Sequence, residues 1–198
     1  MRPAKTKHVM SKKLPAGIIL SGAIILAGCS SSADDQSSTD SSGMYLVNDC
    51  AVVLAPVEQE GAPEGIAVNG LVIGGGEVPV ISVGPDSVPA QELQTDDLIP
   101  GNGASVVVGN TITVNYCGVG QLSGSIFDSS WARGAPATFD LVPGALIEGW
   151  TQGVPGMQVG ERRLLQIPGE LGYGSNPPPG IEANETLVFV VELVSINS

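Results

Sequence analysis

Basic residues are scarce in this 198-residue chain, and most of those present lie near its start. The single histidine is His8, no lysine follows residue 13, and three later arginines stand against all 20 acidic residues, a formal charge of −17. A nucleic-acid partner is excluded, because phosphate binding needs a basic surface. Without further histidine, a Ser-His or Cys-His catalytic pair and imidazole metal ligands are excluded too. We predict neither metal nor cofactor.

No hydrophobic run is long enough to cross a bilayer. The longest, Leu14–Leu26, has about 13 residues, whereas a spanning helix needs about 20. It follows a basic stretch and ends at Leu26-Ala27-Gly28-Cys29, which resembles the lipobox of bacterial lipoprotein signals. That resemblance implies that residues 1–28 are removed and that Cys29 receives a lipid. The alternative is an ordinary secretion signal in which Cys29 is incidental.

The segment after Cys29 lacks large apolar side chains and is rich in serine and aspartate. It cannot bury a core, so we predict a solvated tether over 29–43 between the lipid and a folded part. The protein would then be extracytoplasmic and lipid-anchored to the cell membrane. Residues 44–87 form a β-rich extension of unknown role, and residues 88–198 form one domain.

Only two other cysteines, Cys50 and Cys117, are present, and they form no Cys-x-x-Cys motif. Export to an oxidising compartment favours a disulfide between them, with two free thiols as the alternative. In the run 111–116 apolar residues alternate, so Ile112 and Tyr116 share one face of a strand and Cys117 lies on the other. A disulfide would therefore attach the extension to the side of the sheet away from Tyr116.

Short β-branched runs bounded by glycine and proline dominate the remaining sequence. In the extension they predict strands at 45–47, 51–57, 66–73 and 78–83, a turn at 58–64 and a bend at the triple glycine 74–76. In the domain they predict strands at 111–116, 125–130, 138–141, 162–167 and 186–195, with the only helix at 144–153. The pattern predicts an antiparallel α+β domain whose sheet wraps that helix. Arg162 and Arg163 are interpreted as a solvated pair without function.

Seven ordered sequence blocks then carry a family resemblance: PGNG (100–103), VNYCG (114–118), FDSS (127–130), LIEGW (146–150), GMQVGERRLLQIP (156–168), LGYG (171–174) and TLVFVVEL (186–193). Together they span about 110 residues and resemble the FKBP-type peptidyl-prolyl isomerases. The resemblance implies a twisted five-stranded antiparallel sheet around a short helix, with a hydrophobic pocket between them.

The resemblance also implies a site. Its catalytic residues would be Tyr116, Phe127, Asp128, Ile147, Trp150, Tyr173 and Phe189. Its other substrate-binding residues would be Arg133, Phe139, Leu146 and Ile181. Trp150 would form the floor, while the Ile147 backbone N–H and the Tyr173 hydroxyl would donate hydrogen bonds to substrate carbonyls. Without the resemblance, the aromatic residues would be interpreted as core and Asp128 with Arg133 as a weak surface ion pair.

Several positions depart from the family pattern. Ala137 replaces a common phenylalanine, Val142 replaces a glycine, and Glu182-Ala183 stands where two prolines are usual. The loop 175–180 is also short. These changes lie near the expected rim of the pocket, so we expect them to alter substrate preference and turnover.

Three functions remain open from the sequence. The first is an anchored monomeric isomerase that assists folding of exported proline-containing polypeptides and binds macrolides of the rapamycin type. The second is a non-catalytic chaperone or peptide-binding lipoprotein of the same fold. The third is a structural lipoprotein in which only the fold persists. The retained pocket residues favour the first.

Overall fold

A computed structural model describes residues 43–197, which lie within one compact unit, Thr39–Ser198. The predicted signal, the lipidated Cys29 and all of the tether except Gly43 lie outside the described residues. No helix within 43–197 is both long and apolar enough to cross a membrane.

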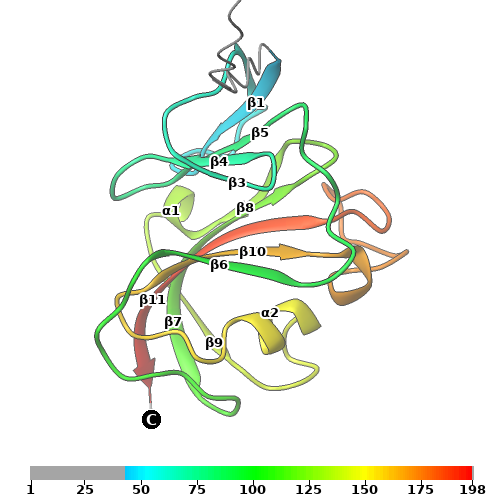
Figure 1. Cartoon of the computed structure of the whole chain (residues 1–198). Coiled ribbons are helices and arrows are strands. Elements are labelled where there is room, and N and C mark those ends of the chain that lie inside the picture. Colours follow the sequence, from blue (N-terminus) through cyan, green and yellow to red (C-terminus); the bar gives the residue numbers. More distant parts are fainter. Residues whose placement is uncertain (1–42, 198) are drawn as a thin grey trace, which may run out of the picture. The chain divides into compact units, whose positions relative to one another are not determined.

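The larger of two sheets is antiparallel and runs in the order β6-β10-β11-β7-β8 (Figure 1). Its strands are β6 (Gln94–Ile99), β7 (Thr111–Gly120), β8 (Ile126–Ser129), β9 (Ala137–Asp140), β10 (Arg162–Ile167) and β11 (Leu187–Asn197). The sixth strand, β9, pairs with the first half of β7, while β8 pairs with the second half. The ten-residue strand β7 thus brings both segments to one edge of the sheet.

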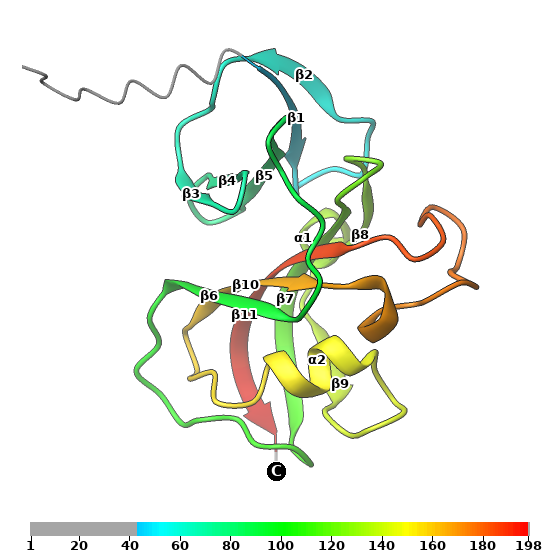
Figure 2. The same ribbon diagram turned by 45° about the vertical axis from the view of Figure 1, so that its right-hand side comes forward.

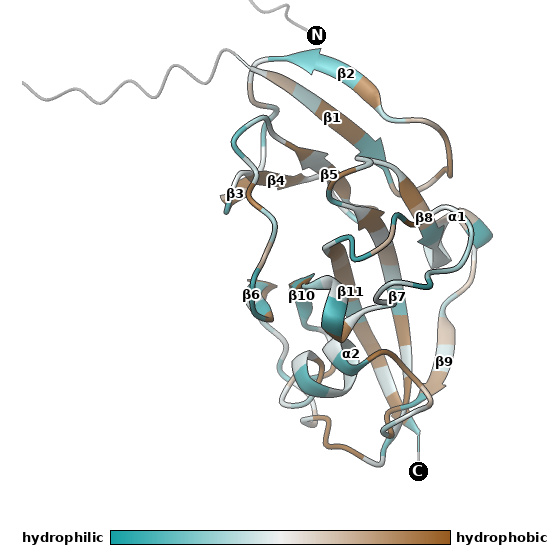
Figure 3. Cartoon of the chain, turned by 90° about the vertical axis from the view of Figure 1, so that its right-hand side faces the viewer, coloured by the Kyte–Doolittle hydropathy of each residue, from teal (hydrophilic) through white to brown (hydrophobic). Residues whose placement is uncertain are grey.

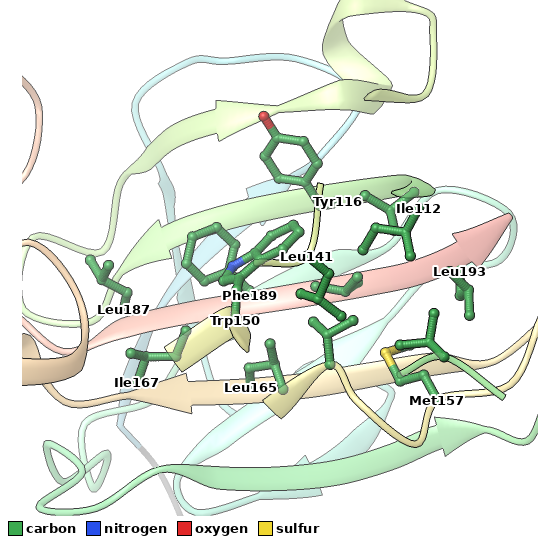
Figure 4. Close-up of a cluster of buried hydrophobic side chains, with 14 residues drawn as sticks. Ile112, Tyr116, Leu141, Trp150, Met157, Leu165, Ile167, Leu187, Phe189 and Leu193 are labelled. Carbon is green, nitrogen blue, oxygen red and sulfur yellow. The ribbon is translucent and has the colours of Figure 1, made fainter. Parts of the chain in front are cut away.

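The predicted alternation along β7 decides which side chains face the helix. Ile112 and Tyr116 are buried in a cluster that also contains Trp150 of helix α2 (Glu148–Gly153) and Val154, the C-cap of that helix (Figure 4). Alternate residues of β11 join the same cluster: Leu187, Phe189, Val191 and Leu193. The α+β fold with a sheet around a short helix, expected from the sequence, is therefore present.

Helix content differs from the prediction in two ways. α2 begins at Glu148 and not at residue 144, because Gly144 has φ +85° and Ile147 is still extended at φ −60°, ψ 149°.

A second helix, α1 (Ser130–Arg133), forms one turn that the prediction of a single helix missed. The Ser129 Oγ caps it by accepting the Ala132 N–H, and Gly134 ends it at φ 72°. A 3₁₀ turn, η1, covers Gly169–Leu171.

The extension forms a second antiparallel sheet, in the order β2-β1-β5-β4-β3. Its strands are β1 (Met44–Asp49), β2 (Val57–Glu60), β3 (Ile66–Val68), β4 (Leu71–Gly74) and β5 (Val80–Val83). The predicted strand 51–57 is wrong: residues 51–56 are irregular, and β2 occupies part of the predicted turn. The predicted strand 66–73 is a hairpin, because Asn69 and Gly70 both have positive φ, 49° and 77°, as a two-residue turn requires.

The extension packs on the face of the large sheet opposite α2 (Figures 1 and 2). A second buried cluster joins Leu71 and Ile81 of the extension with Leu164 and Val190 of the large sheet. The structure contains the Cys50–Cys117 disulfide, which lies within this cluster. The extension is thus attached to the sheet on the side away from Tyr116, as the strand alternation predicted.

The interpretation of Arg162 and Arg163 as a solvated pair is wrong. Arg162 is buried between the sheets, donates to the carbonyls of Gly76 and Glu77 at 2.8 and 2.7 Å, and pairs with Glu192. Arg163 pairs with Asp97 and Glu161 and donates to the Gly153 carbonyl. Neighbouring β residues point to opposite faces, and both faces of β10 are covered, so the side chains of Arg162 and Arg163 are only 8% and 13% exposed.

Candidate active site

An aromatic cluster lies between the large sheet and α2. The Trp150 ring is nearly perpendicular to those of Tyr116 and Phe189, with centroids 5.5 and 5.4 Å apart, and is 3% exposed (Figure 4). Phe139 contacts Trp150 at 5.6 Å, and Phe127 meets Phe189 edge to face at 5.4 Å. Such edge-to-face contacts hold aromatic rings in defined orientations. The rings consequently form rigid apolar surfaces.

These rings enclose one side of a cavity of about 530 Å³. Every site residue expected from the resemblance lines it except Arg133. Three further residues line it that the sequence did not identify: Ala145, Pro178 and Pro179. The three successive prolines of the 175–180 loop were the available signal, since a rigid proline-rich loop beside a pocket presents a fixed apolar surface.

Arg133 lies behind the cavity wall and connects two of its lining residues. Its guanidinium pairs with Asp128, and its Nη2 donates to the Tyr116 hydroxyl at 2.8 Å. The Tyr116 hydroxyl in turn donates to Asp128 Oδ2 at 2.5 Å. The three side chains therefore form a closed triangle of hydrogen bonds. Because the Tyr116 proton is committed to Asp128, this hydroxyl orients the wall and is not a free donor for a ligand.

Two tyrosine hydroxyls at the cavity keep their protons well above neutral pH. Burial, followed by the hydrogen bond to Asp128, raises the pKa of Tyr116 to about 12. Burial also raises the pKa of Tyr173, and the negative charge of Asp128 adds to the effect. Both side chains are thus neutral hydroxyls across the physiological range.

Two donors at the cavity are available to a ligand. The Tyr173 hydroxyl makes no hydrogen bond to another described residue, and its side chain is 40% exposed. The N–H of Ile147, just before the first turn of α2, also lacks a backbone acceptor among residues 43–197. Helix N-terminal N–H groups have no partner within the helix, so a ligand carbonyl can take this position.

The loop above the cavity is held by a buried carboxylate that the sequence did not identify. Glu185 is 5% exposed and accepts the N–H groups of Leu122, Ser123 and Glu182 at 3.0, 2.7 and 2.8 Å. It thereby ties the end of the proline loop to the turn between β7 and β8. The substituted Glu182-Ala183 pair is exposed beside this anchor and does not line the cavity.

The cavity therefore combines apolar aromatic walls with two separate neutral donors. A planar apolar ring fits its walls, and two carbonyls of an extended backbone can accept from Ile147 and Tyr173. No histidine lies among residues 43–197, so none of the described residues can transfer a proton through an imidazole. The arrangement suits binding and reshaping of a peptide backbone and not acid-base chemistry.

Comparison with known proteins agrees with this geometry. A model of the FKBP-type peptidyl-prolyl cis-trans isomerase family matches residues 103–194. The FK506-binding protein of Streptomyces anulatus is 44% identical over 114 residues, covering 57% of this chain and 92% of that protein. The probable FK506-binding protein of Corynebacterium glutamicum is 42% identical, covering 58% and 93% of the two chains. The peptidyl-prolyl isomerase FPR2 of Saccharomyces cerevisiae is 50% identical over 91 residues, covering 46% and 67%.

Proposed function

This chain belongs to the FKBP-type peptidyl-prolyl cis-trans isomerase family, and from that premise we propose that it acts outside the cytoplasmic membrane, as a monomer anchored by a lipid on Cys29. It is a peptidyl-prolyl isomerase, and its clients would be exported polypeptides. The basic stretch, the short apolar run and the Leu-Ala-Gly-Cys motif support the anchor. The Cys50–Cys117 disulfide supports an oxidising location, where such bonds persist.

The aromatic cavity is the observation that carries the proposed mechanism. Rotation about a peptide bond passes through a twisted state, and the ordinary barrier is about 18–20 kcal/mol. In that state the amide loses resonance, so its carbonyl is less polar than in the planar form. An apolar wall of Trp150, Phe189 and Phe127 disfavours the polar planar amide relative to the twisted one. Uncatalysed prolyl isomerisation takes tens to hundreds of seconds, so stabilising the twisted amide can accelerate it.

The two free donors would fix the substrate while its amide rotates. The Ile147 N–H and the Tyr173 hydroxyl can each hold a backbone carbonyl, so that rotation is confined to the Xaa-Pro bond. The triangle of Tyr116, Asp128 and Arg133 would keep the wall in place. No nucleophile, base or metal takes part. A macrolide of the rapamycin type would compete for the same cavity.

Xaa-Pro isomerisation of a short peptide by the purified protein tests this proposal. Tyr173→Phe should lower kcat/KM about tenfold, because one transition-state hydrogen bond is lost. Trp150→Leu should lower it further and weaken macrolide binding. Tyr45→Phe and Trp131→Leu are matched controls, since both residues lie outside the cavity. A folded protein that binds the macrolide without catalysis would favour the peptide-binding alternative.

The anchor has its own test. The wild-type protein should fractionate with the membrane and incorporate labelled lipid, and Cys29→Ser should abolish both. Labelled Cys29→Ser protein, or unlabelled wild-type protein, would contradict lipid anchoring.

A further inference from the structure

An exposed apolar segment of the extension lies beside the active-site cavity. It comprises residues 51–54, here called the apolar ledge, and its Val52, Val53 and Leu54 are 45, 52 and 69% exposed. Figure 3 shows the loop between β1 and β2, which contains the ledge, in hydrophobic colours. None of these three residues belongs to either buried cluster of the described chain. Packing of the core therefore does not account for them.

The apolar ledge forms one wall of a groove of about 400 Å³. The opposite wall comes from β8 and α1 and includes Phe127, Asp128 and Ala132. Phe127 and Asp128 also line the active-site cavity, so they form the boundary between the two hollows. The groove and the cavity are therefore adjacent on either side of Phe127 and Asp128, so a chain that leaves the cavity over Phe127 meets the groove next.

The ledge is held in place at its N-terminal end. Cys50, immediately before it, is bonded to Cys117 of β7, and its carbonyl accepts the Ser129 hydroxyl at 2.7 Å. The Ala51 N–H donates to Asp49 Oδ1 at 2.9 Å, and the Val52 N–H to the Asp49 carbonyl at 3.2 Å. An apolar surface positioned in this way loses little conformational entropy when a ligand covers it.

We propose that the apolar ledge is a second subsite, which binds apolar residues flanking the proline of an unfolded polypeptide. This inference rests on the proposed function, since it extends the same substrate chain beyond the cavity. An extended segment advances about 3.3 Å per residue, so two or three residues next to the proline reach a neighbouring groove. Among residues 43–197, the charged residues that line the groove are Asp128 and Arg133, which pair with each other, so the site favours an uncharged apolar segment.

The test compares peptides with the mature, disulfide-bonded protein. The core peptide is a proline-containing tetrapeptide, lengthened at either end by Leu-Val-Leu or by Ser-Gly-Ser. At one of the two ends, Leu-Val-Leu should lower KM about fivefold relative to Ser-Gly-Ser, because it buries apolar surface on the ledge. In the double variant Val53→Ser, Leu54→Ser this difference should disappear. Val57→Ser is the matched control, since Val57 is 68% exposed but does not line the groove.

The outcomes separate the two proposals. Absence of isomerisation of the core peptide by the wild-type protein would overturn the proposed function. Isomerisation with the same KM for both extensions at both ends would overturn the subsite and leave the proposed function intact. A preference for Leu-Val-Leu that persists in the double variant would also overturn the subsite, because the ledge would then not be what binds the extension. The three substituted positions are exposed, and thermal unfolding of each variant establishes that its fold is intact.

Discussion

The two faces of the large sheet carry different side chains and have different surroundings. On one face Tyr116, Phe189 and Trp150 pack edge to face and leave a cavity of about 530 Å³ beside them. On the other face the buried hydrophobic residues are aliphatic or cysteine, and a second sheet covers them together with the buried Arg162. Both faces bury a hydrophobic cluster, and the face toward α2 also borders the aromatic cavity.

The arginines show the same contrast. Arg133, on the cavity side, has a side chain 48% exposed, and its partner Asp128 is 41% exposed. Arg162, between the sheets, has a side chain only 8% exposed. An exposed ion pair contributes little stability because solvent screens it, whereas removing one partner of a buried pair is costly. The first pair should therefore matter for the site and the second for the fold.

Removal of the disulfide should have the largest effect on stability. Cys50 and Cys117 are 67 residues apart in sequence, and closing a loop of this size stabilises a protein by about 4 kcal/mol in the chain-entropy model. The double variant Cys50→Ala, Cys117→Ala should lose a free energy of unfolding of that order in urea titration. Its kcat/KM for the core tetrapeptide, measured on folded protein, should stay near wild type. Equal stability, or a collapse of tetrapeptide activity in folded protein, would contradict the division between the faces.

Arg162→Met should mainly lower stability, whereas Arg133→Met should mainly lower activity. Arg162→Met leaves Glu192 and two backbone carbonyls without their partner, and should cost about 3 kcal/mol of stability with little change in tetrapeptide kcat/KM. Arg133→Met should cost at most about 1 kcal/mol, because its pair is exposed.

The activity of the Arg133 variant is expected to move instead. Loss of the guanidinium frees Asp128 and Tyr116 from their fixed geometry, so kcat/KM should fall about tenfold. Arg133→Lys should restore part of it, because an ammonium can pair with Asp128 but cannot bridge two groups as a planar fork does. If both methionine variants changed stability and activity alike, the contrast would be refuted.

A further effect concerns high pH. The folded protein retains the Tyr116 proton until about pH 12, whereas the unfolded chain releases it near the ordinary pKa of 10.0. Between these values the unfolded state binds fewer protons, so the free energy of unfolding falls as pH rises. This contribution is present below pH 10 and is lost towards pH 12. The wild-type protein should therefore lose more stability than Tyr116→Phe across pH 10–12 in denaturant titrations, and parallel losses would show that Tyr116 is not responsible.

Local patterns predicted the sheet better than the connections. The bounds of β10 and the shared faces of β7 and β11 followed from period-2 alternation, which depends only on covalent geometry. The hairpin at Asn69-Gly70 was also locally coded, but its turn signal lay inside a continuous β-branched run. The serine that caps α1 and the glycine that ends it were likewise visible in the sequence. The helix was missed because four residues are too few to show a helical pattern.

The candidate site was predicted through sequence blocks that resemble a family, and its supporting residues were not. Glu185 and Arg162 are charged, and a charged side chain in sequence suggests a solvated surface. Both are buried because backbone groups distant in the chain converge on them: three N–H groups on Glu185 and two carbonyls on Arg162. No sequence spacing encodes that convergence.

By itself, the sequence determined the alternation of the strands, the acidity of the chain and the lack of histidine and lysine after residue 13. Each of these is a property of residues and their neighbours in the chain. Only the tertiary structure decided that residues 51–54 lie beside Phe127, that Arg162 is enclosed between two sheets, and that the rings leave a cavity. Each of these features depends on contacts between segments that are far apart in sequence. Such contacts are set by the complementary shapes of the packed surfaces, which the order of residues within one segment does not reveal.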